Sequence, residues 1–579
     1  MHLIPTPKIL RETKDIIYNK TIAFDYVGIE ERLTKAIQKL PHSDDGLPLT
    51  IRVEGSEGES YTLDLTNAGV VITAPSAVGA FYGVQTLRQL LSNETVFACH
   101  VEDAPDFGFR GYYHDVTRGK IPTLEALKEL VDYLAYMKVN SLQLYVEHAF
   151  AFREYSDSVG RTGCLTAQEI RELDDYCHEN YVELIPSLSC FGHLYELLEK
   201  PQYKHLQVLE NYEPQHLYWQ ERMAHHTIDP LHPESFSLIK GMIDQFLPLF
   251  RSDKFNICCD ETFDLQKGKH RDKDIGKLYI DFVNQLISYL KTQGKQVMMW
   301  GDVILQHMDH VQGIPKDTIF LNWFYGADKY EAEEKVRQFS QAVQPQIVCP
   351  ATWAWNHFCE HLPESVPNIT HMTQLGKKYG AMGVLNTNWG DYGDPCGTDM
   401  RLFGMAYGAA RSWNTSTDAQ TVATCTDALI YDHSGTFAIL QRVSQMERTV
   451  HYGDLSWMYN NLYFPGKLAV ADRKESELRE VRNQCLDLIE ELRLQSWTND
   501  YFRQEILIAI RGVAVMAELM MKLWGYGVTR LTDTESWLAQ YRAAWLKKNK
   551  ESELGEIEKM FRLLEESVAQ GQTLLNKKR

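Results

Sequence analysis

Eight short apolar runs recur in the middle of this 579-residue chain, spaced by amphipathic helical segments or long loops. The runs occupy residues 109–116, 141–146, 182–188, 254–259, 296–300, 318–323, 346–351 and 382–386. Helical spacing between them predicts helices at 124–137, 167–179, 234–250, 276–292 and 331–343. Eight β/α units in this length are the count of a closed parallel (β/α)8 TIM barrel. A doubly wound open sheet has a similar rhythm and is the structural alternative.

The segments on either side of the runs predict two further domains, which makes this an α/β protein of three parts. Residues 1–104 contain three half-buried strands and a helix over 77–91 that Ser76 can cap. We expect a small α/β domain at 1–104, the (β/α)8 barrel at 105–413 and an all-α domain at 414–579. The helices expected in the tail lie at 479–494, 502–523, 532–547 and 551–575. Two roles stay open for this tail, which are bracing the barrel and forming the interface of a homodimer.

Charge and cysteine usage exclude several classes of protein. The chain carries 59 basic and 78 acidic residues, and this net charge of −19 disfavours binding to nucleic acid or anionic membranes through bulk charge. Its 11 cysteines form no CxxC pair, which is typical of reduced thiols in a reducing compartment. No secretory signal is visible, and the most apolar stretch, 513–528, contains Glu518 and Lys522 and is too short for a membrane span. We expect a cytoplasmic protein.

Tryptophan and acidic residues follow the predicted strands at the points where those strands end. Trp300, Trp323, Trp353 and Trp389 come after four successive runs. Because the C-terminal ends of barrel strands converge on one mouth, these rings can stack there on the apolar faces of sugar rings or bases. Carboxylates beside them would accept hydrogen bonds from hydroxyl groups. The alternative is a large hydrophobic plug.

Two adjacent carboxylates, Asp260 and Glu261, follow the fourth run. Neighbouring side chains of a strand point to opposite faces, so both can face one ligand only where the strand ends and turns. The pair does not fit the usual acid and nucleophile, which come from different elements at set separations. It suits a division in which one carboxylate donates a proton while its neighbour orients and charge-stabilises a group of the substrate.

The segment 255–262, which contains this pair, resembles the signature of the family 20 glycoside hydrolases, the β-N-acetylhexosaminidases. Residues 109–118 resemble the family's first strand, and residues 184–193 its third. The resemblance covers about residues 60–410 and includes the small domain before the barrel. The helical tail is similar to that of a bacterial, intracellular-type subgroup with a C-terminal helical domain.

Some residues depart from the family pattern. Cys258 stands where the family usually has Gly, and Asn256 where many members have His. Asp391 stands where many members have Glu, and Glu147 with His148 where many have paired Asp. These departures bear on the packing under the acid, on sugar preference and on the hydrogen bonds that support the acid.

The resemblance implies an exo-acting β-N-acetylhexosaminidase that retains anomeric configuration by substrate-assisted catalysis, without metal or organic cofactor. Glu261 would be the general acid, and Asp260 would hold the N–H of the sugar's 2-acetamido group. The substrate would be a small oligosaccharide or glycoconjugate fragment with terminal β-linked GlcNAc or GalNAc. A retaining β-glycosidase for neutral sugars and a non-catalytic sugar-binding barrel are the rivals.

The resemblance also implies polar contacts to the sugar. Arg110 would donate to O3 and O4, and the alternative is an ion pair with Asp115 on the barrel floor. Asp391 would accept from O4 or O6, and the alternative is a loop cap. His193, with Glu147, would support the acid, and the alternative is a satisfied core histidine.

Aromatic residues complete the site that the resemblance implies. Trp389 would form the floor under the sugar, and Trp300 and Trp323 would box the acetamido group. Tyr325 would hold the acetamido oxygen. The full set of expected substrate-binding residues is Arg110, Glu147, His193, Trp300, Trp323, Tyr325, Trp389 and Asp391.

Overall fold

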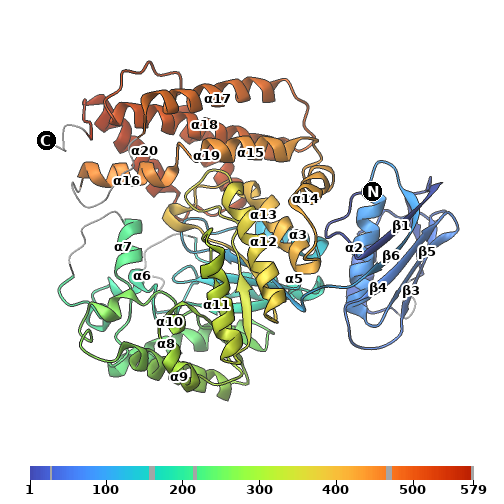
Figure 1. Ribbon diagram of the computed structural model, residues 1–579, viewed down its shortest axis with the longest axis horizontal. Coiled ribbons are helices and arrows are strands. Elements are labelled where there is room, and N and C mark those ends of the chain that lie inside the picture. The colour runs from blue at the N-terminus through green and yellow to red at the C-terminus, as the bar shows by residue number, and fades with distance from the viewer. Residues whose placement is uncertain (26–28, 155–162, 213–217, 464–472, 575–579) are drawn as a thin grey trace.

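The computed structural model describes the chain except for residues 26–28, 155–162, 213–217, 464–472 and 575–579. Its central part is a closed barrel of parallel strands in the order β10-β11-β12-β13-β14-β7-β8-β9 (Figure 1). These strands are β7 Phe109–Asp115, β8 Ser141–Val146, β9 Glu183–Leu188, β10 Lys254–Asn256, β11 Gln296–Trp300, β12 Ile319–Trp323, β13 Gln346–Cys349 and β14 Gly383–Asn388. Each predicted run coincides with one strand, so the closed barrel is confirmed and the open sheet is excluded.

Helices surround this barrel and bury one apolar face each against it. The α5 helix begins with a capping box: the Thr166 side chain accepts the backbone N–H of Glu169, and the Glu169 side chain accepts the backbone N–H of Thr166. The barrel helices are α3 Leu124–Tyr136, α5 Ala167–Glu179, α8 Pro233–Phe246, α9 Ile275–Thr292, α11 Lys329–Gln341, α12 Leu362–Lys378 and α13 Leu402–Trp413. The helices α12 and α13 were not predicted from the sequence. Pro367 lies inside α12, where proline normally breaks a helix, and α13 differs from the other barrel helices in that every one of its residues is buried.

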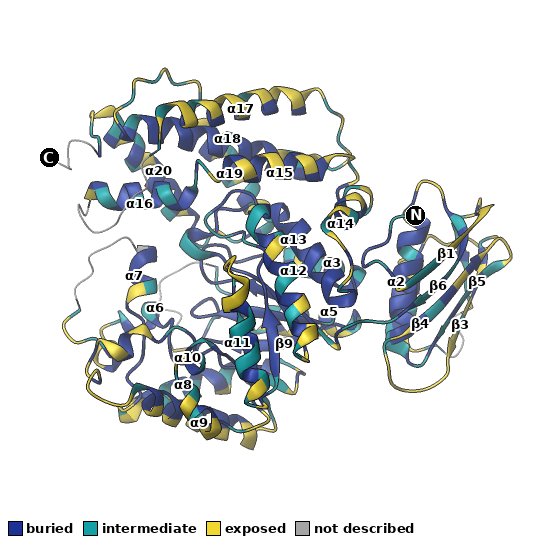
Figure 2. Cartoon of the chain, in the orientation of Figure 1, coloured by how far each residue is buried: buried dark blue, intermediate teal, exposed yellow. Residues whose placement is uncertain are grey.

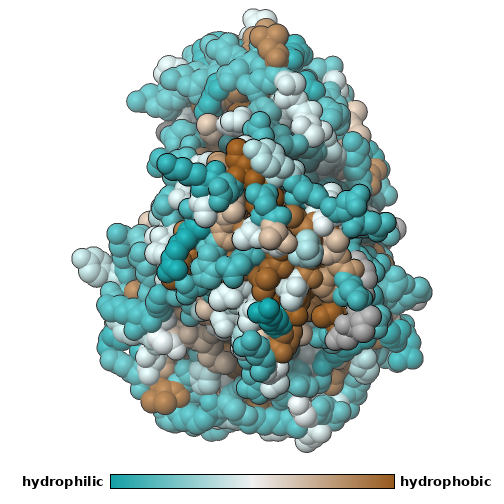
Figure 3. All heavy atoms as spheres, turned by 90° about the vertical axis from the view of Figure 1, so that its right-hand side faces the viewer, coloured by the Kyte–Doolittle hydropathy of each residue, from teal (hydrophilic) through white to brown (hydrophobic). Residues whose placement is uncertain are grey.

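The N-terminal part is a six-stranded mixed sheet in the order β1-β6-β4-β5-β3-β2. Its elements are β1 Ile9–Ile16, β2 Ile22–Ala23, α1 Glu31–Gln38, β3 Leu47–Val53, β4 Tyr61–Thr66, β5 Gly69–Ala74, α2 Ala77–Ser92 and β6 Phe97–Asp103. Ser76 caps α2 by accepting the N–H of Gly79 at 3.1 Å, as expected. Figure 2 shows α2 buried between this sheet and the rest of the molecule. Figure 3 views the molecule from this domain's side and shows apolar side chains gathered among hydrophilic ones.

The C-terminal part is helical and lies on the loops that follow β13 and β14 (Figure 1). The central helix α18 is buried along most of its length, and α17, α19 and α20 pack around it. Its helices are α14 Ala419–Thr426, α15 Thr436–Met446, α16 Tyr452–Tyr463, α17 Glu475–Arg493, α18 Asp500–Leu523, α19 Thr534–Lys548 and α20 Leu554–Ala569. Across the part of the chain that the structure describes, no helix combines the length and the apolar character needed to cross a membrane.

Candidate active site

The carboxylate pair lies in a strained turn at the C-terminal end of β10. The strand ends at Asn256, and Cys258, Cys259 and Glu261 then adopt φ angles of 56°, 63° and 49°. Such left-handed conformations are uncommon for residues other than glycine and often mark functional sites. The turn brings the two carboxylates to one place, since Asp260 Oδ2 and Glu261 Oε2 lie 3.3 and 3.4 Å from one imidazole nitrogen, Nε2 of His193.

The left-handed conformation at Cys258 explains why the family usually has glycine at this position. Glycine adopts this conformation without steric cost, and a cysteine there places a side chain in the centre of the barrel. Its Sγ lies 3.3 Å from Ser187 Oγ and 3.7 Å from Tyr113 Oη. Burial raises the pKa of the Cys258 thiol to about 12, so the thiol acts as packing.

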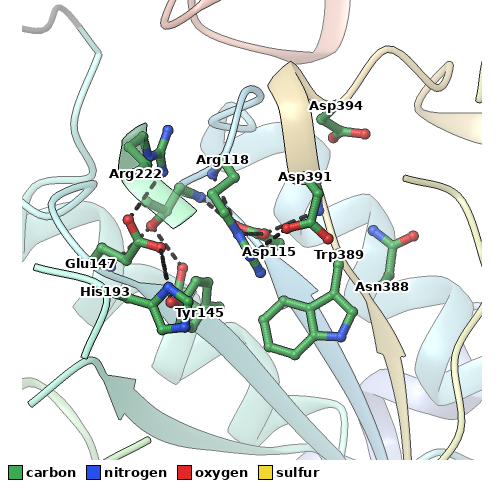
Figure 4. Close-up of polar contacts among 12 residues, drawn as sticks. Asp115, Arg118, Tyr145, Glu147, His193, Arg222, Asn388, Trp389, Asp391 and Asp394 are labelled. Atoms are coloured by element: carbon green, nitrogen blue, oxygen red, sulfur yellow. Dashed lines mark hydrogen bonds and ion pairs between the residues drawn. The ribbon is translucent and has the colours of Figure 1, made fainter. Parts of the chain in front are cut away.

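His193 joins both carboxylates to Glu147 on the neighbouring strand end. Its Nδ1 lies 3.9 Å from Glu147 Oε1 (Figure 4), and its other ring nitrogen, Nε2, is the one that lies near Asp260 and Glu261. Its backbone N–H donates to His226 Nδ1 at 2.8 Å, and the two rings stack at 4.5 Å. Burial alone would lower the pKa of His193, but Asp260 and Glu261 outweigh burial and hold the pKa well above its ordinary value.

Glu147 is buried and bonded to protein groups rather than open to the mouth. It accepts from Tyr145 Oη at 2.9 Å and from Arg222 Nη2 at 3.0 Å. Burial would raise its pKa, but Arg222 and then His193 hold the pKa below its ordinary value. Both carboxylate oxygens of Glu147 therefore lie against protein groups, with His193 and Tyr145 near Oε1 and Arg222 and His148 near Oε2.

Asp302 is a third acidic residue at this site, which the sequence analysis did not select. Its Oδ2 accepts the backbone N–H of Glu261 at 3.0 Å and so holds that residue in its left-handed conformation. Burial, together with Asp260 and Glu261, raises the pKa of Asp302 to about 7. The signal available in the sequence was its position, two residues after the Trp300 that ends β11.

The expected role of Arg110 is wrong. Arg110 lies near the start of β7, at the opposite end of the barrel, where its guanidinium bonds Glu59 of the N-terminal domain at 2.7 and 3.0 Å. The alternative that pairs Arg110 with Asp115 is also wrong, because Asp115 accepts from Arg118 Nε at 2.8 Å. In a (β/α)8 barrel, groups at the N-terminal ends of strands serve stability, and this rule excludes Arg110 from the mouth.

Arg118 takes the place in the mouth that was expected for Arg110. Besides Asp115, it pairs with Asp391 through Nη1, and its guanidinium lies 4.7 Å from the centre of the Trp389 ring (Figure 4). Burial raises the pKa of Asp391 to about 6 even though Arg118 acts in the opposite direction. Arg118 was inside the segment that carries the family resemblance, but sequence alone did not separate it from Arg110.

The expected aromatic residues lie together above the barrel core. Trp300 is fully buried, with its ring 5.5 Å from that of Trp389 and 5.1 Å from that of Tyr113. Trp323 stacks on Tyr325 at 5.0 Å, and the Tyr325 hydroxyl accepts the indole N–H of Trp389 at 2.6 Å. Tyr325 therefore links the two halves of the aromatic wall, and its hydroxyl proton is available for another acceptor.

Several buried polar atoms at this mouth have no hydrogen-bond partner in the protein. Asp260 Oδ1, Asp302 Oδ1 and Trp300 Nε1 are among them. Buried polar atoms nearly always have partners, and a group of exceptions in one place marks where a polar ligand completes the bonding. The carboxylate oxygens offer acceptors and the indole offers a donor, which matches an amide.

His193, Asp260 and Glu261 also offer one ligand atom each within 4.8 Å of one another, which is close enough to hold a metal ion. A metal ligand must be a neutral imidazole, whereas the raised pKa of His193 favours its protonated form. The three side chains therefore fit an ion-paired cluster better than a metal centre.

The closed barrel, the paired carboxylates and the aromatic wall at the C-terminal rim are typical of (β/α)8 glycoside hydrolases. The model of the "Glycosyl hydrolase family 20, catalytic domain" matches residues 107–391, and that of the "Glycosyl hydrolase family 20, domain 2" matches residues 9–104. The chain belongs to glycosyl hydrolase family 20.

Individual relatives are distant. A beta-hexosaminidase of Porphyromonas gingivalis is 28% identical over 299 residues, which are 45% of this chain and 37% of that protein. The human hexosaminidase D is 22% identical over 303 residues, 48% of this chain and 59% of that protein. The chain thus spans between about a third and three fifths of the length of these curated relatives.

Solved structures share the fold at low identity. A chitobiase of Flavobacterium johnsoniae is 17% identical with a TM-score of 0.61, and the match covers 94% of this chain and 98% of that one. The N-acetyl-beta-hexosaminidase of Streptomyces plicatus in complex with Thio-NAglucal is 18% identical with a TM-score of 0.58. This match covers 74% of this chain and 94% of that one. The first match extends the likeness across nearly the whole chain.

Proposed function

We propose that this protein is an exo-acting β-N-acetylhexosaminidase that removes terminal β-linked GlcNAc or GalNAc from small oligosaccharides or glycoconjugate fragments. The observation that carries this proposal is the convergence of Asp260 and Glu261 on His193, with Asp260 Oδ1 buried and unpartnered. Two adjacent carboxylates with one open acceptor suit a reaction in which the substrate supplies its own nucleophile.

In the first step the glycosidic bond is cleaved. The oxygen of the 2-acetamido group attacks the anomeric carbon while Glu261 donates its proton to the leaving oxygen, so a bicyclic oxazolinium-type intermediate forms as the aglycone departs. Asp260 accepts the acetamido N–H and offsets the positive charge that develops on this group. Glu261 has the more exposed side chain of the two, at 23% against 10%, which suits contact with a departing group.

The second step restores the acid and retains the configuration. The Glu261 carboxylate takes a proton from water, the water oxygen bonds to the anomeric carbon, and the bond from that carbon to the acetamido oxygen breaks. His193, whose Nε2 lies 3.3 and 3.4 Å from the two carboxylates, would balance their negative charge through this exchange. The anomeric carbon is inverted twice, and the product retains the β configuration.

Sugar recognition would divide between a polar side and an aromatic side. Asp391 and Arg118 lie side by side at the mouth and would bond O3, O4 or O6. Trp389 would stack on the apolar face of the ring. Trp300, Trp323 and Tyr325 would enclose the acetamido group, with the Tyr325 hydroxyl donating to its oxygen.

The names of similar proteins support an acetamido sugar as the substrate. They include beta-hexosaminidases, a chitobiase and an exo beta-N-acetylglucosaminidase of Vibrio harveyi. A retaining glycosidase for neutral sugars would require a protein nucleophile, and Asp260, whose Oδ2 lies 3.3 Å from His193 Nε2, serves better as an acceptor for an amide.

Turnover of aryl glycosides tests the proposal. We expect hydrolysis of the aryl β-GlcNAc glycoside and no detectable hydrolysis of the matching β-glucoside, which lacks the acetamido group. A thiazoline mimic of the bicyclic intermediate should bind at least a hundredfold more tightly than GlcNAc itself. Equal rates on the two glycosides would overturn the substrate-assisted mechanism, and tight thiazoline binding without turnover would favour a sugar-binding barrel.

We also infer that the enzyme acts in the cytoplasm on small glycans. All eleven cysteines are free thiols, and ten of them are buried, which supports a reducing compartment. Fractionation of the source cells, with activity on the aryl β-GlcNAc glycoside as the marker, would test this location.

A further inference from the structure

The short helix α7, Tyr218–Ala224, touches three groups that frame the proposed sugar site. The ring of Trp219 covers Gly393, where an added Cβ would come within 2.6 Å of it. Arg222 Nη2 donates to Glu147 at 3.0 Å, and Met223 Sδ lies 3.8 Å from Arg118 Nη1. One helix therefore contacts the loop after β14, the support of His193 and the arginine of the mouth.

A residue of the C-terminal helical domain holds this helix in place. Glu553, which immediately precedes α20, accepts the Trp219 indole N–H at 3.0 Å through Oε2 and Arg222 Nη1 at 2.8 Å through Oε1. It is 2% exposed, so its charge is screened little by solvent. The residues just before Glu553 are hydrogen-bonded to the loop after β7. Ser552 Oγ donates to Gly119 O at 2.6 Å, and Lys550 N donates to Ile121 O at 2.8 Å.

These contacts form a row of alternating charges that ends at the catalytic pair. Glu553 pairs with Arg222, and Arg222 pairs with Glu147. Glu147 Oε1 lies 3.9 Å from His193 Nδ1, and His193 Nε2 lies within 3.4 Å of both Asp260 and Glu261. Figure 4 shows the middle of this row, from Arg222 through Glu147 to His193. No side chain among the first four is more than 5% exposed. Buried charges persist only when each has a partner, so the loss of one member changes the balance felt by the next.

We propose that Glu553 is a positioning residue for the proposed reaction, acting on the catalytic acid through Trp219, Arg222, Glu147 and His193. This inference rests on the function proposed above and assigns a role to the helical domain, which completes the site instead of only bracing the barrel. Other titratable groups that face Glu147 include Tyr145, whose hydroxyl donates to Oε1 at 2.9 Å, His148, whose Nδ1 lies 3.7 Å from Oε2, and Arg118.

Glu553→Gln keeps the size of the side chain and removes its charge. Without the negative charge of Glu553, more of the positive charge of Arg222 is felt at Glu147 and offsets the charge of that carboxylate. Glu147 then stabilises the protonated form of His193 less. We expect kcat/KM on the aryl β-GlcNAc glycoside to fall at least tenfold, because small misplacements of catalytic groups cost one to two orders of magnitude. The basic limb of its pH profile should move to lower pH, since removing a negative charge favours loss of protons nearby.

The matched control is Glu551→Gln, two residues earlier. Glu551 is exposed and pairs with Arg542 on the outer surface, so this variant removes the same charge without touching the row. It should keep kcat/KM within twofold and leave the pH profile in place. A role limited to stability would lower the melting temperature of Glu553→Gln and leave its pH profile and the kcat of its folded fraction unchanged, and that result would overturn the proposal.

A readout without turnover separates this inference from the proposed function. In selectively labelled protein, the NMR titration of the His193 imidazole, assigned with His193→Gln, should shift to lower pH in Glu553→Gln and stay unchanged in Glu551→Gln. This shift would support the inference even in a chain that hydrolyses no glycoside, and its absence would overturn it. If Glu553→Gln does not fold, Trp219→Phe, which removes the indole donor and leaves a smaller aromatic ring, should reduce kcat/KM at least threefold and lower the pH at which His193 titrates, or the proposal is wrong.

Discussion

The two ends of the barrel each carry an arginine from β7 or the loop after it, and the two arginines serve different purposes. At the floor, Arg110 bonds Glu59, the Tyr82 hydroxyl and the carbonyls of Phe107 and Lys138. At the mouth, Arg118 bonds Asp115 and Asp391. Every nitrogen of the Arg110 guanidinium bonds a protein group, whereas the mouth holds two buried carboxylate oxygens, Asp260 Oδ1 and Asp302 Oδ1, without protein partners. The same residue type therefore stabilises an interdomain contact at one end and prepares a site at the other.

The largest effect expected at the mouth is on chemistry. Glu261→Gln should reduce kcat for an aryl glycoside with a poor leaving group by about a thousandfold, because general acid catalysis supplies two to four orders of magnitude. Thiazoline affinity and the melting temperature should stay close to those of the parent, since the side chain is partly exposed. Unchanged kcat in both Glu261→Gln and Asp260→Asn would show that the pair is not catalytic.

A matched pair of variants tests the contrast between the two arginines. Arg110→Met leaves Glu59 without its cation and should lower the free energy of unfolding by about 3 kcal/mol, with kcat/KM of the folded protein unchanged. Arg118→Met should reduce kcat/KM by at least tenfold. Thermal unfolding and steady-state kinetics of both proteins measure this. The contrast fails if Arg110→Met lowers kcat/KM of the folded protein as much as Arg118→Met.

A smaller effect is expected from Asp302, whose pKa is raised to about 7 by burial, Asp260 and Glu261. A carboxyl with a raised pKa in the folded state stabilises the fold most below its unfolded pKa of 3.8 and loses this contribution as the pH rises through 7. Asp302→Asn does not titrate and keeps an acceptor for the Glu261 N–H. Its stability relative to the parent should therefore improve between pH 4 and 7, by about 1 kcal/mol per pH unit at the steepest point.

Chemical denaturation at several pH values measures this difference. The control is Asp272→Asn, whose side chain in the parent is 93% exposed and whose stability difference should be flat across the same range. Parallel pH curves for Asp302→Asn and the parent would show that Asp302 is ionised throughout.

The barrel was predictable because its strands are short, apolar and regularly spaced, so local sequence carries the signal. The position of Asp260 and Glu261 was predictable for the same reason, since they directly follow an apolar run, although the strand within that run already ends at Asn256. Arg110 was misassigned because a motif match gives the order of residues and not the end of the strand on which they lie. A count along β7 would have corrected this, because Arg110 is the second residue of the strand.

The contacts that join distant parts of the chain left no local signal. Arg222 and Glu553 are 331 residues apart, and each looks like an ordinary charged residue of an amphipathic helix. Asp302 lies next to a glycine and begins a short helix, where an aspartate is commonplace. Only tertiary packing shows that these side chains are buried and directed at one another.

The fastening of residues 548–553 to the loop after β7 has a consequence for how the protein matures. Thr123 N bonds Lys548 O, and Glu553 N bonds Gly119 O, so the rim of the barrel is completed by a segment that is synthesised after every strand. All eight barrel strands are synthesised before Glu553, the residue that bonds Trp219 and Arg222 of α7. With Glu553 in the positioning role proposed above, the ribosome must release most of the helical domain before the site is complete, and the timing of synthesis becomes a step in its assembly.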